Sequence, residues 1–355
     1  MPPDPASAIR PAVRAMAGYT PGEQPRGGDY IKLNTNENPY PPSPRVFEAI
    51  RAALTGDRLR KYPDPLGTDF RRIAANVLGV EPDMILIGNG SDDILTILTR
   101  AFVPEGGLIV SPTPSYLLYR TLAEIQGARF QTVPYTMPEW DVPSPWPVRG
   151  ASLAYVANPN SPSGTTLNLA TLERFAEEVG GPLVIDEAYV DFADTNALPL
   201  LKRHRNVIIT RSLSKSYSLA GIRFGFAVAD AAVVRELVKV KDSYNCDALS
   251  LAAATAALGD QAYLRKTVDH IRRERQVLSD ALTGRRFAVT PSQANFVWCR
   301  RTDRPVKPIY EALKESRILV RYMNYPDYGD GLRITVGAPT DMQSLSERLD
   351  GILAR

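Results

Sequence analysis

The sequence predicts an α/β fold with a mostly parallel sheet, because short apolar runs alternate with longer amphipathic stretches. The chain has 355 residues, of which 44% are hydrophobic. That is long enough for a sizeable core and for two domains of roughly 150 residues each. Apolar residues recur at three and four positions over 92–102 and 169–179, which predicts helices there. We therefore expect one large sheet with helical connections.

The pattern of predicted strands and helices changes after Asp247, which divides the chain into two regions. Before it, seven short apolar runs predict the strands of one large sheet, at residues 84–87, 107–111, 128–133, 152–157, 183–186, 206–210 and 223–229. After it come a long helical tract (248–282), shorter strands (287–299, 318–321, 332–336) and a terminal helix from Met342. We expect a large domain over residues 46–246 and a smaller α+β domain over residues 247–355, completed by residues 1–45.

Composition excludes several classes of protein. The 42 basic and 39 acidic residues give a net charge of only +3, and arginine pairs are scattered, so a nucleic-acid surface is not expected. No apolar run approaches the ~18 residues of a membrane span, and the N-terminus lacks an apolar signal core. We expect a cytoplasmic protein. With two distant cysteines and two histidines, CxxC zinc sites and disulfide frameworks are excluded, and no metal is expected.

Polar residues that follow the strands are the first candidates for a ligand site, because open α/β sheets bind ligands beyond the carboxyl ends of their strands. The segment Gly88-Asn89-Gly90-Ser91-Asp92 follows one strand and opens a helix, which directs backbone N–H groups at an anion. This pattern suits a phosphate, although Ser91 or Asp92 as an ordinary helix cap is the alternative. A dinucleotide fingerprint is excluded, because Asp93 occupies the third glycine position.

Lys215 lies in a serine-rich segment, Ser212-Leu213-Ser214-Lys215, which Arg223 follows. A lysine amine attacks aldehydes when its pKa is lowered, and a neighbouring cation such as Arg223 lowers it together with partial desolvation. Ser212, Ser214 and Arg223 are suited to hold a phosphate while Lys215 forms a Schiff base with an aldehyde of the same molecule. Pyridoxal phosphate carries both groups. A solvated lysine in a loop is the alternative.

Asp186 ends an otherwise apolar strand, where a carboxylate needs a partner. Facing the ring nitrogen of a pyridine, it would keep that nitrogen protonated, so that the ring accepts electrons. A helix cap or a salt bridge is the alternative. Tyr189, three residues later, is placed to donate to the phenolic oxygen of the cofactor. The segment from Asn158 to Gly164 by itself indicates only a turn.

Taken in order, these motifs resemble the fold type I pyridoxal-phosphate aminotransferases of class I/II, and among them the histidinol-phosphate aminotransferases. The resemblance covers nearly the whole chain. It is carried by the segments 32–40, 62–64, 88–92, 112–116, 158–164, 186–189, 212–215 and 332–337.

The resemblance implies roles for individual residues. Lys215 would bind the cofactor covalently and move protons at the substrate Cα, and Tyr116 would stack on the pyridine ring. Tyr62 would reach the phosphate from the other subunit of a homodimer. Residues around the phosphate would be Gly90, Ser91, Asp92, Ser212, Ser214 and Arg223. The family usually has Asn before the Pro-Thr-Gly of the turn, whereas this chain has Ser161, so that either Ser161 or Asn158 would contact the phenolic oxygen.

The substrate is expected to meet two arginines. Arg333 resembles the arginine that clamps the α-carboxylate of glutamate through a guanidinium fork. Histidinol phosphate lacks that carboxylate, so its phosphate would need the same fork or Arg321. Tyr19 would close over it, and Asn36 and Glu37 would line the entrance.

The expected reaction converts histidinol phosphate and 2-oxoglutarate to imidazole acetol phosphate and glutamate. Three other functions on the same scaffold stay open at this point. They are an aromatic amino-acid aminotransferase, a phosphothreonine decarboxylase and a non-catalytic pyridoxal-phosphate-binding regulator.

Overall fold

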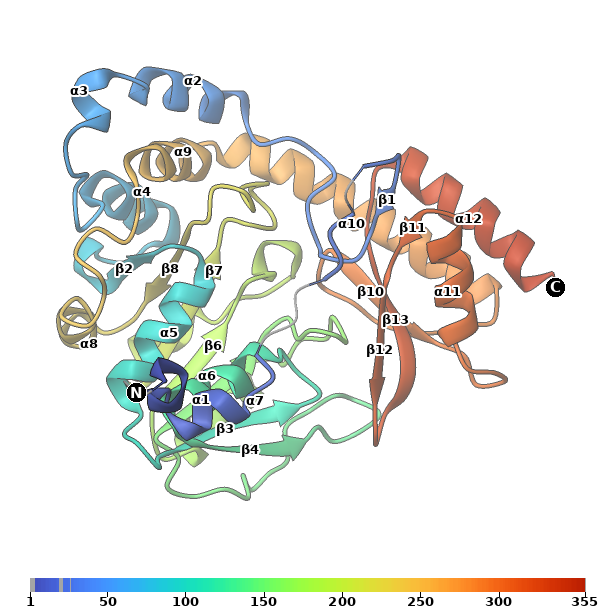
Figure 1. The fold of residues 1–355 in the computed structure, drawn as a ribbon, viewed down its shortest axis with the longest axis horizontal. Coiled ribbons are helices and arrows are strands. Elements are labelled where there is room, and N and C mark those ends of the chain that lie inside the picture. Colours follow the sequence, from blue (N-terminus) through green and yellow to red (C-terminus); the bar gives the residue numbers. More distant parts are fainter. Residues whose placement is uncertain (1–3, 19–21, 26, 355) are drawn as a thin grey trace.

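The computed structural model describes residues 4–18, 22–25 and 27–354. A large α/β part and a smaller part lie side by side, and the long helix α10 (Gln261–Gly284) extends from the first toward the second (Figure 1). The prediction made for Tyr19 falls outside the described residues.

Within the described residues, seven strands form one sheet in the large part, which confirms the predicted fold class. In spatial order they are β2 (Ile85–Gly88), β8 (Gly225–Val228), β7 (Val207–Ser212), β6 (Leu183–Asp186), β5 (Leu153–Ala157), β3 (Leu108–Thr113) and β4 (Arg129–Pro134). All neighbours are parallel except β8, which is antiparallel to both β2 and β7. Residues 213–224 join β7 to β8 without the crossover helix that a parallel pair uses, so the chain turns back.

Helices cover both faces of this sheet, and successive strand residues alternate between the two cores. On β6, Val184 packs in a core with residues of α5 (Ser91–Phe102), α6 (Leu118–Gln126) and α8 (Ala231–Leu237). Its neighbour Ile185 packs in a second core with α7 (Leu169–Glu178). Burial on both faces explains why central strands such as β5 and β6 are nearly continuous apolar runs in the sequence.

The smaller part has a four-stranded antiparallel sheet. Its order is β12 (Arg321–Tyr325), β13 (Gly329–Thr335), β10 (Phe296–Arg300) and β9 (Ala288–Thr290), with α10, α11 (Lys307–Glu315) and α12 (Pro339–Leu353). The N-terminal strand β1 (Ile31–Lys32) pairs in parallel with β11 (Ile318–Leu319). Leu33 packs in the same core as these helices and strands. The N-terminal segment around β1 therefore lies with the smaller part.

The long helical tract expected over 248–282 is two helices, α9 (Ala248–Gly259) and α10. Asp260 lies between them with φ −101° and ψ 64°, and its carboxylate caps α10 by accepting from the backbone N–H of Tyr263. The strand expected over 287–299 is likewise divided into β9 and β10. An aspartate that caps a new helix thus interrupts a helical pattern that reads as continuous in the sequence.

Helix α9 packs against α2 (Pro44–Ala53) and α4 (Thr68–Leu78) in a core with strands of the large sheet. We therefore propose that the boundary between the domains lies at Asp260 rather than after residue 246. Two short helices complete the fold, α1 (Pro11–Ala15), which contacts α6, and α3 (Gly56–Leu59). Among the described helices, none combines the length and the apolar character needed to cross a membrane.

Candidate active site

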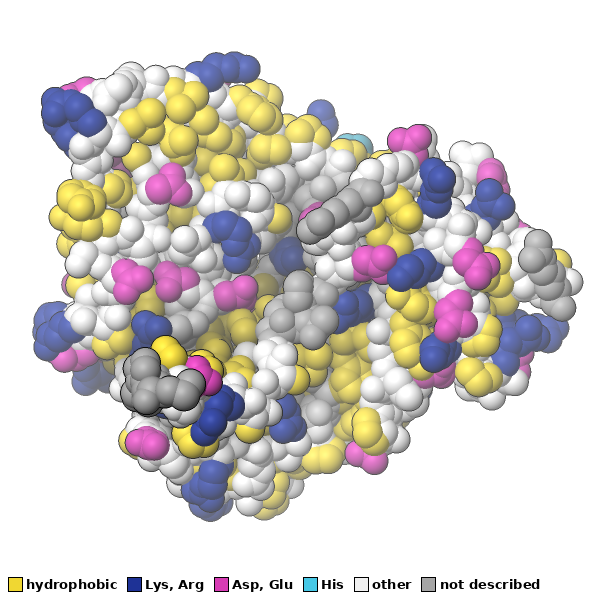
Figure 2. Space-filling view, viewed as in Figure 1, with side chains coloured by type: hydrophobic (Ala, Val, Ile, Leu, Met, Phe, Trp, Pro, Cys, Tyr) yellow, Lys and Arg dark blue, Asp and Glu magenta, His cyan; other side chains and the backbone are white. Residues whose placement is uncertain are grey.

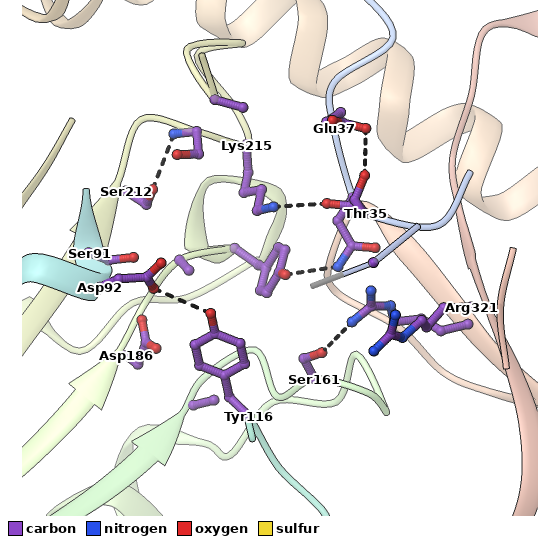
Figure 3. Close-up of a pocket in the computed structure, with 18 of the residues that line it drawn as sticks. Thr35, Glu37, Ser91, Asp92, Tyr116, Ser161, Asp186, Ser212, Lys215 and Arg321 are labelled. Atoms are coloured by element: carbon purple, nitrogen blue, oxygen red, sulfur yellow. Dashed lines mark hydrogen bonds between the residues drawn. The ribbon is translucent and has the colours of Figure 1, made fainter. Parts of the chain in front are cut away.

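A cavity of about 350 Å³ lies where the carboxyl ends of the sheet strands face the smaller part (Figure 3). Its lining residues come from the ends of β5, β6 and β7, the start of α5, the N-terminal segment and strands β12 and β13. Strand β2 also ends at this edge, because the antiparallel β8 separates it from β7 and leaves the two parallel. The topology thus gathers segments that are far apart in the sequence.

Lys215 points across the cavity toward the N-terminal segment (Figure 3). Its Nζ donates a hydrogen bond to the backbone oxygen of Thr35 at 3.0 Å. The pKa of Lys215 is lowered to about 8, mainly by burial. The positive charges of Arg333 and Arg223 contribute to this lowering, and the contribution of Arg333 is the larger of the two. At pH 7 about one tenth of the amine is then neutral, far more than for an ordinary lysine. The expected lowering is present, but its main causes are burial and Arg333.

The start of α5 forms an anion site with Arg223. Gly90, the residue before the helix, has φ 85°, and a β-carbon there would lie 2.6 Å from Nη2 of Arg223. With ψ 166° this backbone conformation favours glycine, and a larger residue would also displace the Arg223 guanidinium. Arg223 approaches Asp92 at 3.6 Å and Oγ of Ser214 at 3.4 Å. Besides these three side chains, Ser91 and Ser212 also line the cavity. A cation, hydroxyls and a helix start fit a phosphate group.

This anion site has supports that sequence reasoning missed. The carboxylate of Asp93 accepts from the backbone N–H of Asn89 and from Nδ2 of Asn245, both at 2.9 Å. At Gly225 a β-carbon would lie 2.5 Å from the backbone N of Ser91. A glycine at the start of a strand is a weak signal of such close packing. Asn245 has no local signal, because its partner Asp93 is 152 residues away.

Asp186 forms the floor of the cavity at the end of β6, with only 5% of its surface exposed. Its carboxylate accepts from the hydroxyls of Tyr119 at 2.9 Å and Thr210 at 3.1 Å. Burial raises the pKa of Asp186 to about 6. The partners of this carboxylate, the two hydroxyls and the backbone N–H of Ala188, are uncharged, so a protonated ring nitrogen in the cavity would supply an opposite charge. The residues present therefore fit a pyridinium ring as well as a phosphate.

The turn after β5 carries Asn158 and Ser161, the two candidates for contact with the phenolic oxygen of the cofactor. The amide of Asn158 is bonded to the backbone of Leu167, accepting at 2.8 Å and donating at 3.5 Å. The cavity lining includes Ser161 but not Asn158, so the placement of Asn158 does not favour the predicted contact with a cofactor. Oγ of Ser161 accepts from Nη1 of Arg333 at 2.9 Å (Figure 3).

Three tyrosines of the predicted site have different surroundings. Tyr116 lines the cavity, and its hydroxyl donates to Asp92 at 3.3 Å (Figure 3). Tyr189 also lines the cavity, and its ring centroid lies 5.9 Å from Nζ of Lys215. Tyr62 is 80% exposed and stacks on Tyr244 with centroids 4.4 Å apart. It does not line the cavity of its own chain.

The wall opposite the sheet carries cations. Arg321 and Arg333 both line the cavity, and they are direct partners across β12 and β13. Arg333 also donates to the backbone oxygen of Asn34 at 3.0 Å. Glu37 reaches the lining, held by Lys32 at 2.6 Å and by the hydroxyl of Thr35 at 2.6 Å.

The contact of Asn36 with a substrate stays a prediction, and the structure shows which protein groups its side chain contacts. Its side chain is buried at 1% exposure, although the residue borders the cavity. Its amide is bonded to Tyr189 and Thr335. A side chain whose amide already has protein partners on both ends is better suited to support the site than to contact a substrate.

The comparisons with known proteins agree with this geometry. Residues 28–352 match the family model described as aminotransferase class I and II. The histidinol-phosphate aminotransferase of Rhodopirellula baltica is 53% identical over 331 residues, which are 92% of this chain and 91% of the relative. Histidinol-phosphate aminotransferase 1 of Nostoc sp. is 45% identical, over 97% of this chain and 98% of the relative.

A solved structure is similar to this chain in fold and, to a lesser degree, in sequence. It is the histidinol-phosphate aminotransferase of Sinorhizobium meliloti in complex with pyridoxal-5'-phosphate, with a TM-score of 0.83 and 28% identity over 91% of each chain. The match of the family model to nearly the whole chain accords with a buried lysine amine, a strand-end carboxylate and an anion site in one cavity. This chain belongs to the class I and II aminotransferases.

Proposed function

We propose that this aminotransferase binds pyridoxal phosphate and transfers the amino group of histidinol phosphate to 2-oxoglutarate, which gives imidazole acetol phosphate and glutamate. The similarity to relatives that carry this name supports the proposal. The structural observation that carries it is the pairing of Arg321 with Arg333 across β12 and β13, with both side chains at the cavity. We also propose a cytoplasmic location, since the substrates are water-soluble small molecules.

Two guanidinium groups on one wall suit a phosphate better than a carboxylate. A phosphate monoester carries close to two negative charges at neutral pH, whereas an α-carboxylate carries one. Arginine forks bind both groups through paired, charge-assisted hydrogen bonds. Arg333, already oriented by Ser161 and Asn34, serves both substrates in this proposal. Arg321 adds the second charge that only histidinol phosphate requires.

The sheet side of the cavity would hold the cofactor. Its phosphate would lie with Ser91, Ser212, Ser214 and Arg223 at the start of α5, and its ring nitrogen with Asp186. Tyr116 would cover the ring. The hydroxyls of Ser161 and Tyr189 would be the donors to its phenolic oxygen. When bound, pyridoxal phosphate supplies an aldehyde that exchanges amino groups and a ring that accepts electrons from the substrate carbon.

Lys215 would be the catalytic base. Its lowered pKa leaves a usable fraction of neutral amine, so Nζ can take a proton from the substrate carbon and return it to a neighbouring position. The backbone oxygen of Thr35, 3.0 Å from Nζ, gives the protonated amine a partner in this cavity. Charge on the nearby Arg333 opposes protonation of the amine and so keeps it reactive.

A half-reaction screen tests the substrate. The cofactor-loaded protein is mixed with histidinol phosphate, glutamate, phenylalanine or tyrosine, and the loss of the visible cofactor absorbance is followed in parallel. We expect fast conversion by the first two and slow conversion by the others. Faster conversion by phenylalanine or tyrosine would assign an aromatic aminotransferase instead, and carbon dioxide release a decarboxylase. Borohydride reduction without a pyridoxyl adduct on the Lys215 peptide would contradict the enzyme assignment itself.

We also propose a homodimer whose interface includes the surface around α2 and α3. Hydrophobic side chains gather over the region of α2 and α9 (Figure 2). Along this stretch Phe47, Leu54, Leu59 and Tyr62 are all exposed by 45% or more. Such a patch is typical of a protein interface. It would carry Tyr62 toward the phosphate site of a second subunit. Sedimentation velocity at micromolar concentration should give the mass of a dimer, and a monomer would contradict the proposal.

A further inference from the structure

Asn36 connects three parts of the protein through one buried amide. Its side chain is 1% exposed, and its backbone has φ 58°, a left-handed conformation that asparagine adopts more readily than most residues. Nδ2 donates to the hydroxyl of Tyr189 at 2.8 Å, and Oδ1 accepts from the hydroxyl of Thr335 at 3.1 Å. The N-terminal segment therefore links β13 of the smaller part to Tyr189 of the large part.

We propose that Asn36 is a positioning residue, held by Thr335, that directs the hydroxyl proton of Tyr189 into the cavity. The inference rests on the proposed binding of pyridoxal phosphate, whose phenolic oxygen would receive that proton. It does not depend on which amino donor the enzyme uses.

The hydrogen bonds of Thr335 determine which end of the amide faces Tyr189. The backbone N–H of Asn36 can only donate, and it donates to Oγ1 of Thr335 at 3.0 Å. Thr335 therefore directs its own proton elsewhere, and Oδ1 of Asn36 receives it. In the reversed orientation of the amide, the buried hydroxyl of Thr335 would lack an acceptor among the described residues. An unsatisfied buried proton is costly, so the NH₂ end faces Tyr189.

The orientation of the amide sets the direction of the Tyr189 proton. Because Nδ2 of Asn36 donates to Oη of Tyr189, the hydroxyl proton cannot lie on the same line and must point away from Asn36. Tyr189 borders the cavity, where an acceptor on a ligand would meet that proton. Burial raises the pKa of Tyr189, which keeps the hydroxyl protonated and able to donate.

The same strand carries both this support and the anion clamp. Thr335 is two residues from Arg333 on β13, so both side chains lie on one face of the strand. The backbone of Asn36 is held in turn by Nδ2 of Asn295, which donates to its oxygen at 3.0 Å. Substrate recognition by Arg333 and the polarity of the Tyr189 hydroxyl thus depend on the same part of the smaller sheet.

The test reverses the polarity with little change in shape. In Asn36→Asp, the new carboxylate still accepts from Thr335 but cannot donate to Tyr189 when ionised. The hydroxyl of Tyr189 then donates to this carboxylate, away from the cavity. We expect Asn36→Asp to behave like Tyr189→Phe, with a roughly tenfold weaker equilibrium binding of pyridoxal phosphate. The visible absorbance of the bound cofactor changes with pH, and the midpoint of this change should rise by about one unit. The reason is that the lost Tyr189 hydroxyl donor had favoured the deprotonated form of the bound cofactor.

Three further variants complete the design. The double variant Asn36→Asp with Tyr189→Phe should show no further loss beyond Tyr189→Phe, since both act through one hydroxyl. Thr335→Val should shift the same two quantities in the same direction by a smaller factor, because the amide loses its fixed orientation. This variant also decides the matter if Asn36→Asp does not fold. Asn168→Asp, an isosteric change at the cap of α7, should match the parent in both measurements.

The outcomes separate this inference from the proposed function. Unchanged binding and an unchanged pH midpoint in both Asn36→Asp and Thr335→Val, while Tyr189→Phe shifts both, would overturn the inference alone. Additive effects in the double variant would overturn it as well. A parent protein that takes up no pyridoxal phosphate would overturn the proposed function, and the inference with it.

Discussion

The two walls of the cavity are built by different means. Besides Lys215, the sheet-side wall includes short side chains at strand ends or a helix start, such as Asp186 and Ser91. Asp186 in particular is held between the hydroxyls of Tyr119 and Thr210. The opposite wall has long cationic side chains, Arg321 and Arg333, on paired strands of the smaller part.

Because of this difference, we expect one wall to hold the cofactor and the other to select the substrate. A buried carboxylate held by several hydrogen bonds has one position, which suits a cofactor that stays bound through every reaction cycle. Long arginine side chains have more conformational freedom, which suits two amino donors that must exchange. We therefore expect changes to the sheet-side wall to affect every substrate equally. Changes to the arginine wall should alter the ratio between substrates.

The largest effect is expected for Lys215→Ala on the sheet-side wall. The variant should lose transamination with all donors by roughly 10²- to 10⁴-fold or more, because the amine is both nucleophile and proton carrier. It should still bind pyridoxal phosphate, but reversibly and without a borohydride-stable adduct. Single-turnover absorbance measurements give the rate, and Lys266→Ala on the exposed surface is the control. Parent-like turnover without an added amine would disprove the role of Lys215.

The next effect is expected for Asp186→Asn, which removes the negative charge from the cavity floor while keeping the shape. We expect kcat/KM to fall by roughly 10²-fold for histidinol phosphate and glutamate alike, since a protonated ring would lose its counter-charge. Steady-state kinetics with both donors measure this, with the exposed Asp83→Asn as control. A loss for only one donor would break the proposed division between the walls.

A smaller and selective effect is expected for Arg321→Gln. The variant should raise KM for histidinol phosphate by roughly 10- to 100-fold, because a charge-assisted contact to its phosphate is lost, and change KM for glutamate by no more than about threefold. Arg333→Gln should weaken both donors. The comparison needs KM and kcat for each donor in each variant, with the surface change Arg304→Gln as control. Equal losses for both donors in Arg321→Gln would show that the two arginines do not divide the substrates.

The smallest effect is expected on the pKa of Lys215, which lies on one wall and is lowered by the charge of Arg333 on the other. In the ligand-free protein the rate of pyridoxal phosphate uptake should rise with pH around a midpoint near 8, where the amine loses its proton. Arg333→Gln should raise this midpoint by less than about one unit, and more than Arg223→Gln does, because Arg333 lowers this pKa more strongly. The reverse order would contradict the electrostatic coupling between the walls.

The same pKa makes a prediction about stability. The pKa of Lys215 is about 8 in the folded protein and 10.5 in an ordinary lysine, so the unfolded chain binds more protons between these values. The contribution of this group to the free energy of unfolding should therefore rise from pH 8 to about pH 10.5. Urea unfolding of ligand-free parent and Lys215→Met across this range should show a smaller rise for the variant. Parallel curves would contradict the lowered pKa.

Much of the sheet-side wall is predictable because its signals are local. The apolar run before Asp186 identifies a strand, and polar residues at a strand end lie at the ligand-binding edge of a parallel sheet. Similarly, Gly90-Ser91-Asp92 lies between a strand and a helix, and the structure places this segment beside Arg223. The sequence pattern does not reveal that Glu187, next to Asp186, faces the other way and pairs with Arg211 at 2.8 Å.

The residues that support the site were not predictable. Tyr119 is 67 residues from Asp186, and Thr335 is 299 residues from Asn36. No periodicity or spacing links such pairs, because the contact exists only after the helices and strands have packed. The reversed direction of β8 and the break at Asp260 have the same origin, since both depend on what the chain packs against.

The sequence by itself determined the strands of the large sheet, the position of Asp186 at a strand end and that of Lys215 in the loop after a strand, because burial and turn preferences act over a few neighbouring residues. Only the tertiary structure decided which side chains hold these groups in place and which charges set their pKa values. Hydrogen-bond geometry and electrostatic coupling depend on distances through space, and in this protein the short distances join the N-terminal segment, the sheet edge and β13.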